Sequence, residues 1–339
     1  MLKSLATSIA ALALLGAAAP DKPGVQGRQR PASEFQPAFS HKLGTAADWV
    51  VITTSGAWVG AAGPNAVYRI AARTGRVDRR VALPDEACAG LVAGFGSLWV
   101  PLCGAQPRTA RIDLHSGRIV ALLPFGPPAE ASIAVGGDSV WLAIDAHGTL
   151  ARIDPRTNRI RQRIRLVSGS MNPVADGNSV WVTSTERNRV TKVNARSGAV
   201  LGAAPTGPGP RFVTVGAGSV WTLNQGDGSV TRIASHDLRV KATIALGIPG
   251  HGGDIAFGGG YIWATSIGVP LTALDPGSNQ VVAQWVGPGG DSLRFGHGSI
   301  WLTDYKRGLV QRLPLSSLRL PHERLAHHSP ARRSRGALK

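Results

Sequence analysis

Charged and amide side chains recur in the glycine-rich loops of this 339-residue chain. Some stand at the start of a short apolar run, and others follow a tryptophan by three or four residues. Carboxylate and amide oxygens can hold a divalent cation, and with guanidinium groups they can hold a small polar molecule. Asp and Asn in such loops also cap turns, which is the alternative for each residue taken alone. The candidate ligand-binding residues are Asp48, Arg211, Asn224, Gln225, His251, Asp254, Asp291 and Asp304.

The sequence contains none of the common catalytic motifs. It has no G-x-S-x-G nucleophile motif. His322 and His327 stand five positions apart and would not share a helix face, unlike the histidines of a zinc-binding H-E-x-x-H motif. The loops 207–210, 249–254 and 288–291 are nearly bare of side chains, so their N–H groups could approach an anion. Crowding of the loops would favour glycine equally.

A tryptophan repeats along the chain with spacings of 41, 42, 40, 40, 42 and 38 residues. In copies two to seven a turn pair such as Ala217-Gly218 precedes it, which predicts a two-residue hairpin. A third apolar run, a second turn and a fourth run follow each tryptophan. A period near 40 residues with several short strands is typical of a β-propeller blade, so the chain is predicted to be an all-β, seven-bladed β-propeller of four-stranded antiparallel blades. The repeated residues are Trp58, Trp99, Trp141, Trp181, Trp221, Trp263 and Trp301.

The fourth strand of the last blade is missing from the C-terminal side, where Arg319-Leu320 meets Pro321. The segment 39–44 precedes the first blade and fits the fourth-strand pattern. We therefore expect it to complete the seventh blade and to join the two ends of the chain, which removes an open seam. The predicted organisation is a signal peptide at 1–19, a linker at 20–37, the propeller at 38–320 and a basic tail at 321–339.

The repeated sequence motifs GSVW…VTRI and LARIDPRTNRI…RIRL resemble YVTN-type (YncE-like) propeller repeats, and more loosely the virginiamycin B lyase-like propellers. The resemblance extends over about residues 39–320 and implies the propeller architecture. In the lyase-like enzymes, loop histidines perform acid–base chemistry and glutamates help to bind a metal. The matching loop positions here hold Arg211, Gly253 and Asp291, and only Asp304 supplies a carboxylate after the tryptophan. This departure argues against lyase activity.

Export is expected from the N-terminus and from the cysteines. Lys3, a short apolar run and the Ala17–Ala19 region form a signal-peptide pattern that is too short to span a membrane. If Phe95-Gly96 is a two-residue turn, Cys88 and Cys103 oppose one another across that hairpin, within reach of a disulfide. We expect this bond to form in an oxidising compartment, the periplasm or the exterior.

The net charge of +17 has two interpretations. Arg159, Arg161, Arg163 and Arg165 alternate with other residues and would share one face of a strand. This face either keeps an outer edge soluble or binds a polyanion, and the first is favoured because exposed aromatic residues are not interleaved with the charge.

The function predicted from the sequence is that of an exported, monomeric binding or scaffold protein. Its partner at one mouth of the channel would be a small polar molecule or a protein. The first alternative is a metal-assisted lyase or hydrolase in which Asp254, Asp291 and Asp304 hold a divalent cation. The second is polyanion binding by the basic rim.

Overall fold

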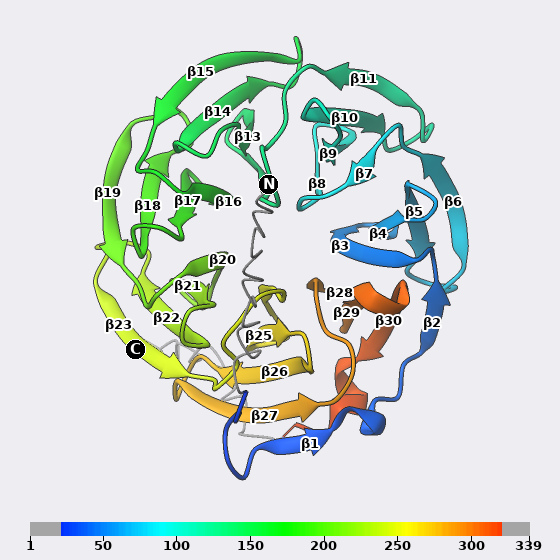
Figure 1. Ribbon diagram of the computed structural model, residues 1–339, viewed down its shortest axis with the longest axis vertical. Helices are drawn as coiled ribbons and strands as arrows, with labels where there is room; N and C mark the ends of the chain where they lie inside the picture. Colours follow the sequence, from blue (N-terminus) through cyan, green and yellow to red (C-terminus); the bar gives the residue numbers. More distant parts are fainter. Residues whose placement is uncertain (1–21, 321–339) are drawn as a thin grey trace, which may run out of the picture.

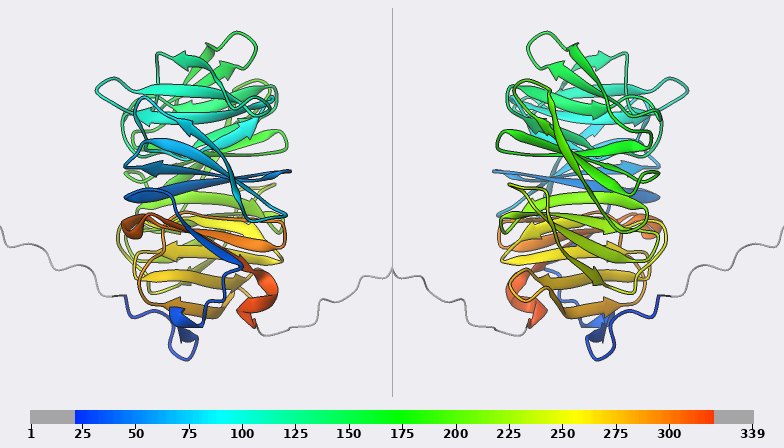
Figure 2. Two further views of the ribbon diagram at one scale, coloured as in Figure 1. Left: turned by 90° about the vertical axis from the view of Figure 1, so that its right-hand side faces the viewer. Right: turned by 90° about the vertical axis from the view of Figure 1, so that its left-hand side faces the viewer.

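Seven small sheets stand in a ring around a central axis (Figure 1), and from the side the ring is a thick disc (Figure 2). The computed structural model describes residues 22–320, so the predicted signal peptide and basic tail lie outside the described residues. Each sheet contains four antiparallel strands, although the inner strand of the second sheet is split in two and the outer strand of the seventh comes from the start of the chain. The predicted all-β, seven-bladed propeller is confirmed.

The strands follow one another from the axis to the rim within each blade. The first four blades comprise β3 (Ala46–Thr53), β4 (Gly56–Ala62), β5 (Ala66–Ala71) and β6 (Val77–Ala82); β7 (Glu86–Ala87), β8 (Val92–Gly94), β9 (Ser97–Cys103), β10 (Arg108–Asp113) and β11 (Ile119–Leu123); β12 (Ile133–Gly136), β13 (Ser139–Ala143), β14 (Thr149–Asp154) and β15 (Arg159–Arg165); and β16 (Ser170–Asp176), β17 (Ser179–Ser184), β18 (Arg189–Asn194) and β19 (Val200–Pro205).

The last three blades continue the same order. They comprise β20 (Pro210–Gly216), β21 (Ser219–Asn224), β22 (Ser229–Ala234) and β23 (Val240–Ala245); β24 (Ile255–Gly258), β25 (Tyr261–Ser266), β26 (Val269–Asp275) and β27 (Gln280–Val286); and β28 (Leu293–Gly296), β29 (Ser299–Asp304) and β30 (Leu309–Pro314). The N-terminal part adds β1 (Gln29–Pro31) and β2 (Phe39–Lys42), and the 3₁₀ helices are η1 (Ala32–Glu34), η2 (Tyr305–Arg307) and η3 (Leu315–Leu318).

The repeated tryptophans are the largest buried side chains of the blades. In five blades the indole Nε1 donates to the carbonyl of the glycine five residues earlier, as Trp221 does to Gly216 at 3.0 Å. The hairpin turns before them have two residues, and Ala217 and Gly218 both have positive φ, at 49° and 67°. In these five blades the ring is therefore tied to its own hairpin, which explains why the turn pair and the tryptophan recur together.

An arginine in the third strand links neighbouring blades. Arg232 lies over the Trp221 ring at 4.7 Å and donates Nε to Ser219. Its Nη1 reaches the turn of the next blade, at 2.6 Å from the carbonyl of Pro276 and 2.8 Å from Asn279 Oδ1. Arg111, Lys192 and Arg312 make the same kind of contact from blades two, four and seven.

The last blade takes its outer strand from the start of the chain. β2 pairs antiparallel with β30, with Phe39 opposite Arg312 and Lys42 opposite Leu309. The seventh sheet therefore has the order β2-β30-β29-β28, and segments almost 270 residues apart lie side by side (Figure 1).

The part of the predicted linker that the structure describes is packed against the propeller. β1 pairs parallel with β27 and makes the sixth sheet five-stranded. Arg30 lies over the Trp285 ring at 5.8 Å, and Phe35 contacts the same ring at 5.7 Å. A composition rich in proline, glutamine and arginine predicted a linker here. Within the described residues, backbone pairing and contacts with the Trp285 ring hold the segment against blade six.

The predicted disulfide between Cys88 and Cys103 is present, with a Cα–Cα distance of 5.5 Å. The register differs from the simple hairpin. Val92 opposes Trp99 as expected, but Glu86 rather than Cys88 opposes Cys103, because the inner strand of blade two is split into β7 and β8. The bond therefore bridges neighbouring positions, not opposite ones.

Candidate functional site

The blade topology brings two sets of loops to one end of the channel. Each inner strand begins at this end and each second strand finishes there, because consecutive strands are antiparallel. The residues ahead of the inner strands and after the second strands therefore surround one opening, which we call the channel mouth.

Two aromatic side chains meet inside the ring behind the mouth. Trp49 of blade one and Phe212 of blade five have ring centroids 6.2 Å apart, and both are only 3 % exposed. Each stands nine residues before the tryptophan of its blade. Trp49 has a left-handed φ of 55°, at a bulge between Asp48 and Val50. A large residue in this backbone region persists only where its surroundings hold it, which fits a side chain that closes a channel.

Carboxylates from three blades lie close together at the mouth, namely Asp48, Glu130 and Asp291. Burial raises the pKa of Asp48 well above its ordinary value, and repulsion by Asp291, Glu130 and Asp254 adds to the effect. Burial also raises the pKa of Asp291, to about 6, against a hydrogen bond from the Gly253 N–H that favours the charged form. Asp48 and Asp291 are therefore costly to ionise without a compensating positive charge.

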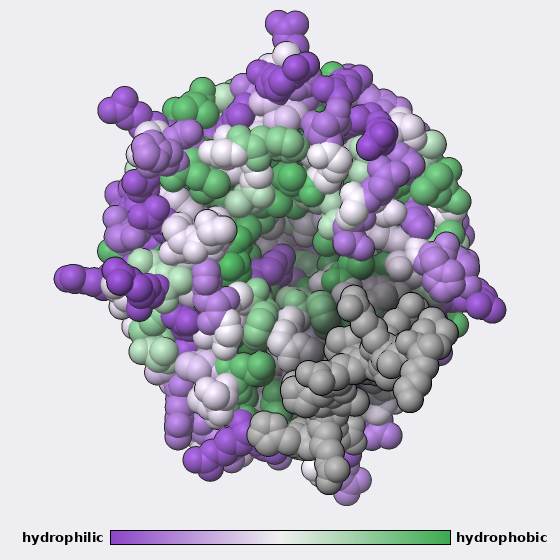
Figure 3. Space-filling view, turned by 180° about the vertical axis from the view of Figure 1, so that it is seen from behind, coloured by the Kyte–Doolittle hydropathy of each residue, from purple (hydrophilic) through white to green (hydrophobic). Residues whose placement is uncertain are grey.

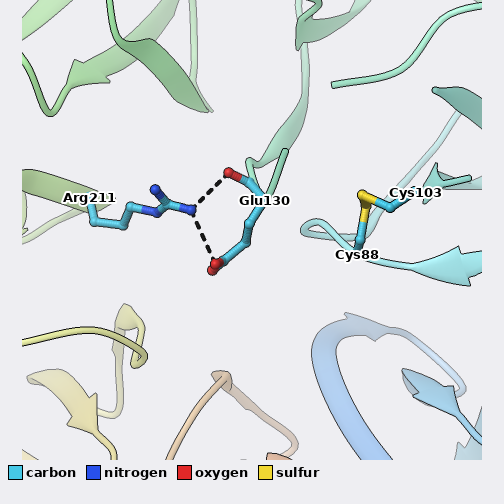
Figure 4. Close-up of a disulfide and its surroundings, with 4 residues drawn as sticks. All are labelled: Cys88, Cys103, Glu130 and Arg211. Carbon is cyan, nitrogen blue, oxygen red and sulfur yellow. Dashed lines mark hydrogen bonds and ion pairs between the residues drawn. A yellow bond between two sulfur atoms is a disulfide. The ribbon is translucent and has the colours of Figure 1, made fainter. Parts of the chain in front are cut away.

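The third carboxylate, Glu130, is paired with a guanidinium from blade five. Arg211 at the start of β20 reaches Glu130, which precedes β12, with Nη2 3.1 Å from Oε2 and 2.9 Å from the backbone carbonyl. Figure 4 shows the two side chains pointing toward one another within the ring, with the Cys88–Cys103 bond beyond Glu130. The same guanidinium lies 6.0 Å from the Phe212 ring.

The structure does not place every predicted residue where a ligand could reach it. Asn224 is fully buried and its amide is saturated: Nδ2 donates to Ser229 and Thr231, and Oδ1 accepts from Thr222, all at 2.9 Å. The Asn224 amide is therefore fully used within blade five in this structure. Gln225 is half-buried, and its Nε2 donates to the carbonyl of Gly252 in the next blade. His251 is exposed on the loop before β24.

The carboxylates proposed to hold a metal are engaged with arginines. Asp254 is buried and binds Arg294, the hydroxyl of Ser292 and the N–H groups of Ile255 and Leu293. Asp304 caps η2 and binds Arg307. Within residues 22–320 no three His, Cys, Asp or Glu side chains are arranged to hold a metal ion. The proposed carboxylate ring of Asp254, Asp291 and Asp304 is thus not a formed cation site.

Two site residues were not among the predicted ligand set. Glu130 lies in the loop before β12, which contributes no residue to that set. Phe212 follows Arg211 in an apolar run, a pattern that indicates burial in a strand. Alignment of the blades on their tryptophans would have identified Phe212, because position nine before the tryptophan holds Trp49 in blade one and polar residues in four others.

Two cavities open between blades six and seven beside the mouth. One, of about 290 Å³, is lined by residues including Ile267, Gly289 and Tyr305, and the other, of about 370 Å³, extends to Phe35 and Pro37 of the N-terminal segment. The Asp304–Arg307 pair borders both. Neither Asp48 nor Glu130 lines them, and Gly289 and Gly290 of the loop before Asp291 line both.

The arginines of β15 are exposed along one face, as expected. Arg161 among them is bound to Asp138 at 2.8 Å and to Asp154 at 2.9 Å. Hydrophilic side chains occupy much of the outer rim on the face turned away from the viewer of Figure 1, which is hollowed at its centre (Figure 3). The rim charge is therefore partly neutralised by the chain itself.

Fold and site define a seven-bladed β-propeller with an aromatic closure and a carboxylate-rich mouth. No family model and no curated protein matches the chain. Among solved structures, the crystal structure of BamB from Moraxella catarrhalis is similar, with a TM-score of 0.60 and 14% sequence identity over 83% of this chain and 97% of that chain. At this identity the similarity shows the fold alone.

Proposed function

We propose that the protein is an exported binding protein whose channel mouth holds a cationic group, an ammonium or a guanidinium. The observation that carries the proposal is the position of Arg211. Its guanidinium is bonded to Glu130 at the mouth and lies over the Phe212 ring, 6.0 Å from the ring centroid. Carboxylates beside an aromatic ring are the groups that recognise organic cations, and here the chain already uses them to hold a cation of its own.

Export is supported by the signal-peptide pattern of residues 1–19 and by the Cys88–Cys103 disulfide, because structural disulfides persist in oxidising compartments. None of the helices within residues 22–320 is long and apolar enough to cross a membrane. We assign the repeats to the YVTN-type pattern because of their sequence motifs. We favour binding over metal-assisted lyase chemistry because the Asp254 and Asp304 carboxylates are paired with arginines.

Calorimetric titration with agmatine, a small dication that carries a guanidinium and an ammonium group, tests the proposal at pH 7.5. We expect binding to wild type, at least tenfold weaker binding to Asp291→Asn and Glu130→Gln, and no binding of glutarate, because removal of one charged partner costs about 1.5–3 kcal/mol. Asp176→Asn is the matched control: this carboxylate is exposed at the other end of β16. Equal binding of glutarate, or no effect of either mouth variant, would overturn the proposal.

Arg211 occupies the site in the unliganded protein, so it competes with an external cation. Replacement Arg211→Ala should therefore tighten agmatine binding several-fold and make it enthalpically more favourable. Weaker binding by this variant would contradict the idea that Arg211 stands in for the ligand.

A further inference from the structure

Blade four contains buried polar atoms without a partner. Ser170 and Asn172 at the start of β16 are each only 1 % exposed. Among the described residues, Ser170 Oγ and both Asn172 side-chain atoms, Nδ2 and Oδ1, have no hydrogen-bond partner. Buried polar groups in native proteins are almost always paired, so a cluster of three orphaned atoms points to a missing water or ligand.

The repeat places Asn172 in the wall of the mouth site. It stands nine residues before Trp181, the position that Trp49 and Phe212 hold in their own blades, where they meet inside the ring. The same position in blades six and seven holds Asp254 and Ser292, whose side chains are hydrogen-bonded to one another at 3.1 Å. Of the residues at this position, Asn172 has a buried amide without a partner, whereas the Asp254 carboxylate is bound by Arg294.

Contacts also join Asn172 to the arginine of the site. Its ladder partner in β17 is Thr183, and the Thr183 hydroxyl donates to the backbone carbonyl of Arg211 at 3.0 Å. Blade four lies between the blades that carry Glu130 and Arg211, so the ion pair between them passes the opening of β16. The orphaned atoms therefore lie at the start of the inner strand that stands between the two blades joined by this ion pair.

The free groups have a defined chemistry. A primary amide with both Nδ2 and Oδ1 unpaired offers one donor and one acceptor side by side, which is the complement of another carboxamide or peptide group. The Ser170 hydroxyl can donate or accept beside it. A carboxylate would satisfy only the donors and would lie close to Glu130, which disfavours it.

We infer that the channel mouth contains a neutral subsite, formed by Ser170 and Asn172, that recognises a carboxamide or peptide group attached to the bound cation. The inference rests on the proposed function and narrows its ligand to a basic amino-acid amide or a basic peptide. The cationic end lies with Asp291 and Glu130, and the amide lies with blade four.

Three probes that differ at one carbon test the subsite. L-Argininamide is agmatine with a carboxamide on the carbon that bears the amine, and L-arginine carries a carboxylate there. We expect argininamide to bind wild type at least tenfold more tightly than agmatine, and arginine to bind no better than agmatine. The variants Asn172→Leu and Ser170→Ala should reduce the preference for argininamide to less than threefold while agmatine binding stays unchanged. Ser197→Ala, in the turn at the opposite end of blade four, is the matched control and should keep the full preference.

A second measurement separates the possible results. Because Asn172→Leu replaces an unpaired amide, the melting temperature of the ligand-free variant should not fall. A large fall, or an unchanged preference for argininamide, would mean that the amide is satisfied by ordered water and would overturn the subsite. Failure of all three probes would instead overturn the proposed function, so the two failures are distinguishable.

Discussion

Asp291 shows how the mouth is kept ready for a positive charge. Its carboxylate is largely buried, accepts a hydrogen bond from the Gly253 N–H at 3.0 Å and lies near three other carboxylates. Burial and this repulsion raise its pKa to about 6, so the charged form present at neutral pH is unfavourable in the folded protein. A bound cation would relieve that penalty, which gives the ligand a thermodynamic reason to bind.

The variant Asp291→Asn should change how stability depends on pH. The folded-state pKa lies above the ordinary 3.8, so the native state holds the Asp291 proton more tightly than the unfolded chain does. The folded protein therefore loses stability through this group as the pH rises from about 4 to 6. Above pH 6.5 the variant should therefore be more stable than wild type, by an amount on the order of 3 kcal/mol. Below pH 4 the difference should vanish. Urea unfolding of both proteins between pH 3.5 and 8 measures it, and a constant difference across this range would contradict the prediction.

The third strands of the blades connect the ring through their arginines. In β22 the Arg232 guanidinium is held by the Trp221 ring, the Ser219 hydroxyl and two acceptors in the turn of blade six. Burial lowers the pKa of this guanidinium, which shows that the charge is partly removed from water. In blades two and five the arginine of the recurring Arg-Ile pattern is therefore an inter-blade contact, and part of the basic charge is structural.

Replacement Arg232→Met should destabilise the protein by about 3 kcal/mol, because it removes hydrogen bonds from a charged donor and a cation–π contact and leaves buried acceptors unpaired. Arg239→Met is the matched control: that side chain is 81% exposed and binds only Asp237, so the loss should stay below about 0.5 kcal/mol. Chemical denaturation followed by tryptophan fluorescence measures both. Equal losses in the two variants would show that the inter-blade contact is dispensable.

The first hairpin of blade two depends on its disulfide. β7 contributes only two residues, and the chain between β7 and β8 has no ladder pairing, so Cys88–Cys103 replaces hydrogen bonds near the mouth. The double variant Cys88→Ser/Cys103→Ser should lose about 3 kcal/mol, the loop-closure value for a separation of 15 residues. Thiol labelling of the unreduced exported protein should detect no free cysteine. Two reactive thiols would refute the bond.

At the scale of the whole molecule, the N-terminal segment pairs with two blades of the ring. β2 supplies the outer strand of blade seven, and β1 covers the outer edge of blade six. Blade six lacks the usual arginine, since Ala273 stands opposite Trp263, and the N-terminal segment brings Arg30 and Phe35 to that blade instead. The segment therefore adds an arginine and an aromatic ring to the outer strand of blade six, on Trp285.

Deletion of residues 38–44 should abolish cooperative folding, because it exposes the edge of β30 and removes Phe39 from the Trp301 ring, 5.4 Å away. Differential scanning calorimetry should then show no single unfolding transition. Phe39→Ala is a milder variant that should retain the transition but lower its midpoint, since the loss of a packed Phe costs about 3–5 kcal/mol. A deletion variant that melts like wild type would contradict closure by β2.

The sequence by itself determined the architecture, because each blade repeats the same local physics. A buried tryptophan, a two-residue turn and alternating apolar residues specify one hairpin. When seven such units follow one another, a closed ring is the arrangement that buries both faces of every blade. The Cys88–Cys103 pair could be found in the same way, since it depends on contacts within one hairpin, although the split of its inner strand could not.

The site was decided by the tertiary structure. Asn224 and Arg211 both stood out in the sequence, yet one is saturated inside its own blade and the other crosses to Glu130, 81 residues away. Which carboxylates face an arginine and which face one another depends on where seven blades meet around an axis. No local pattern encodes that proximity, because the partners come from different repeats.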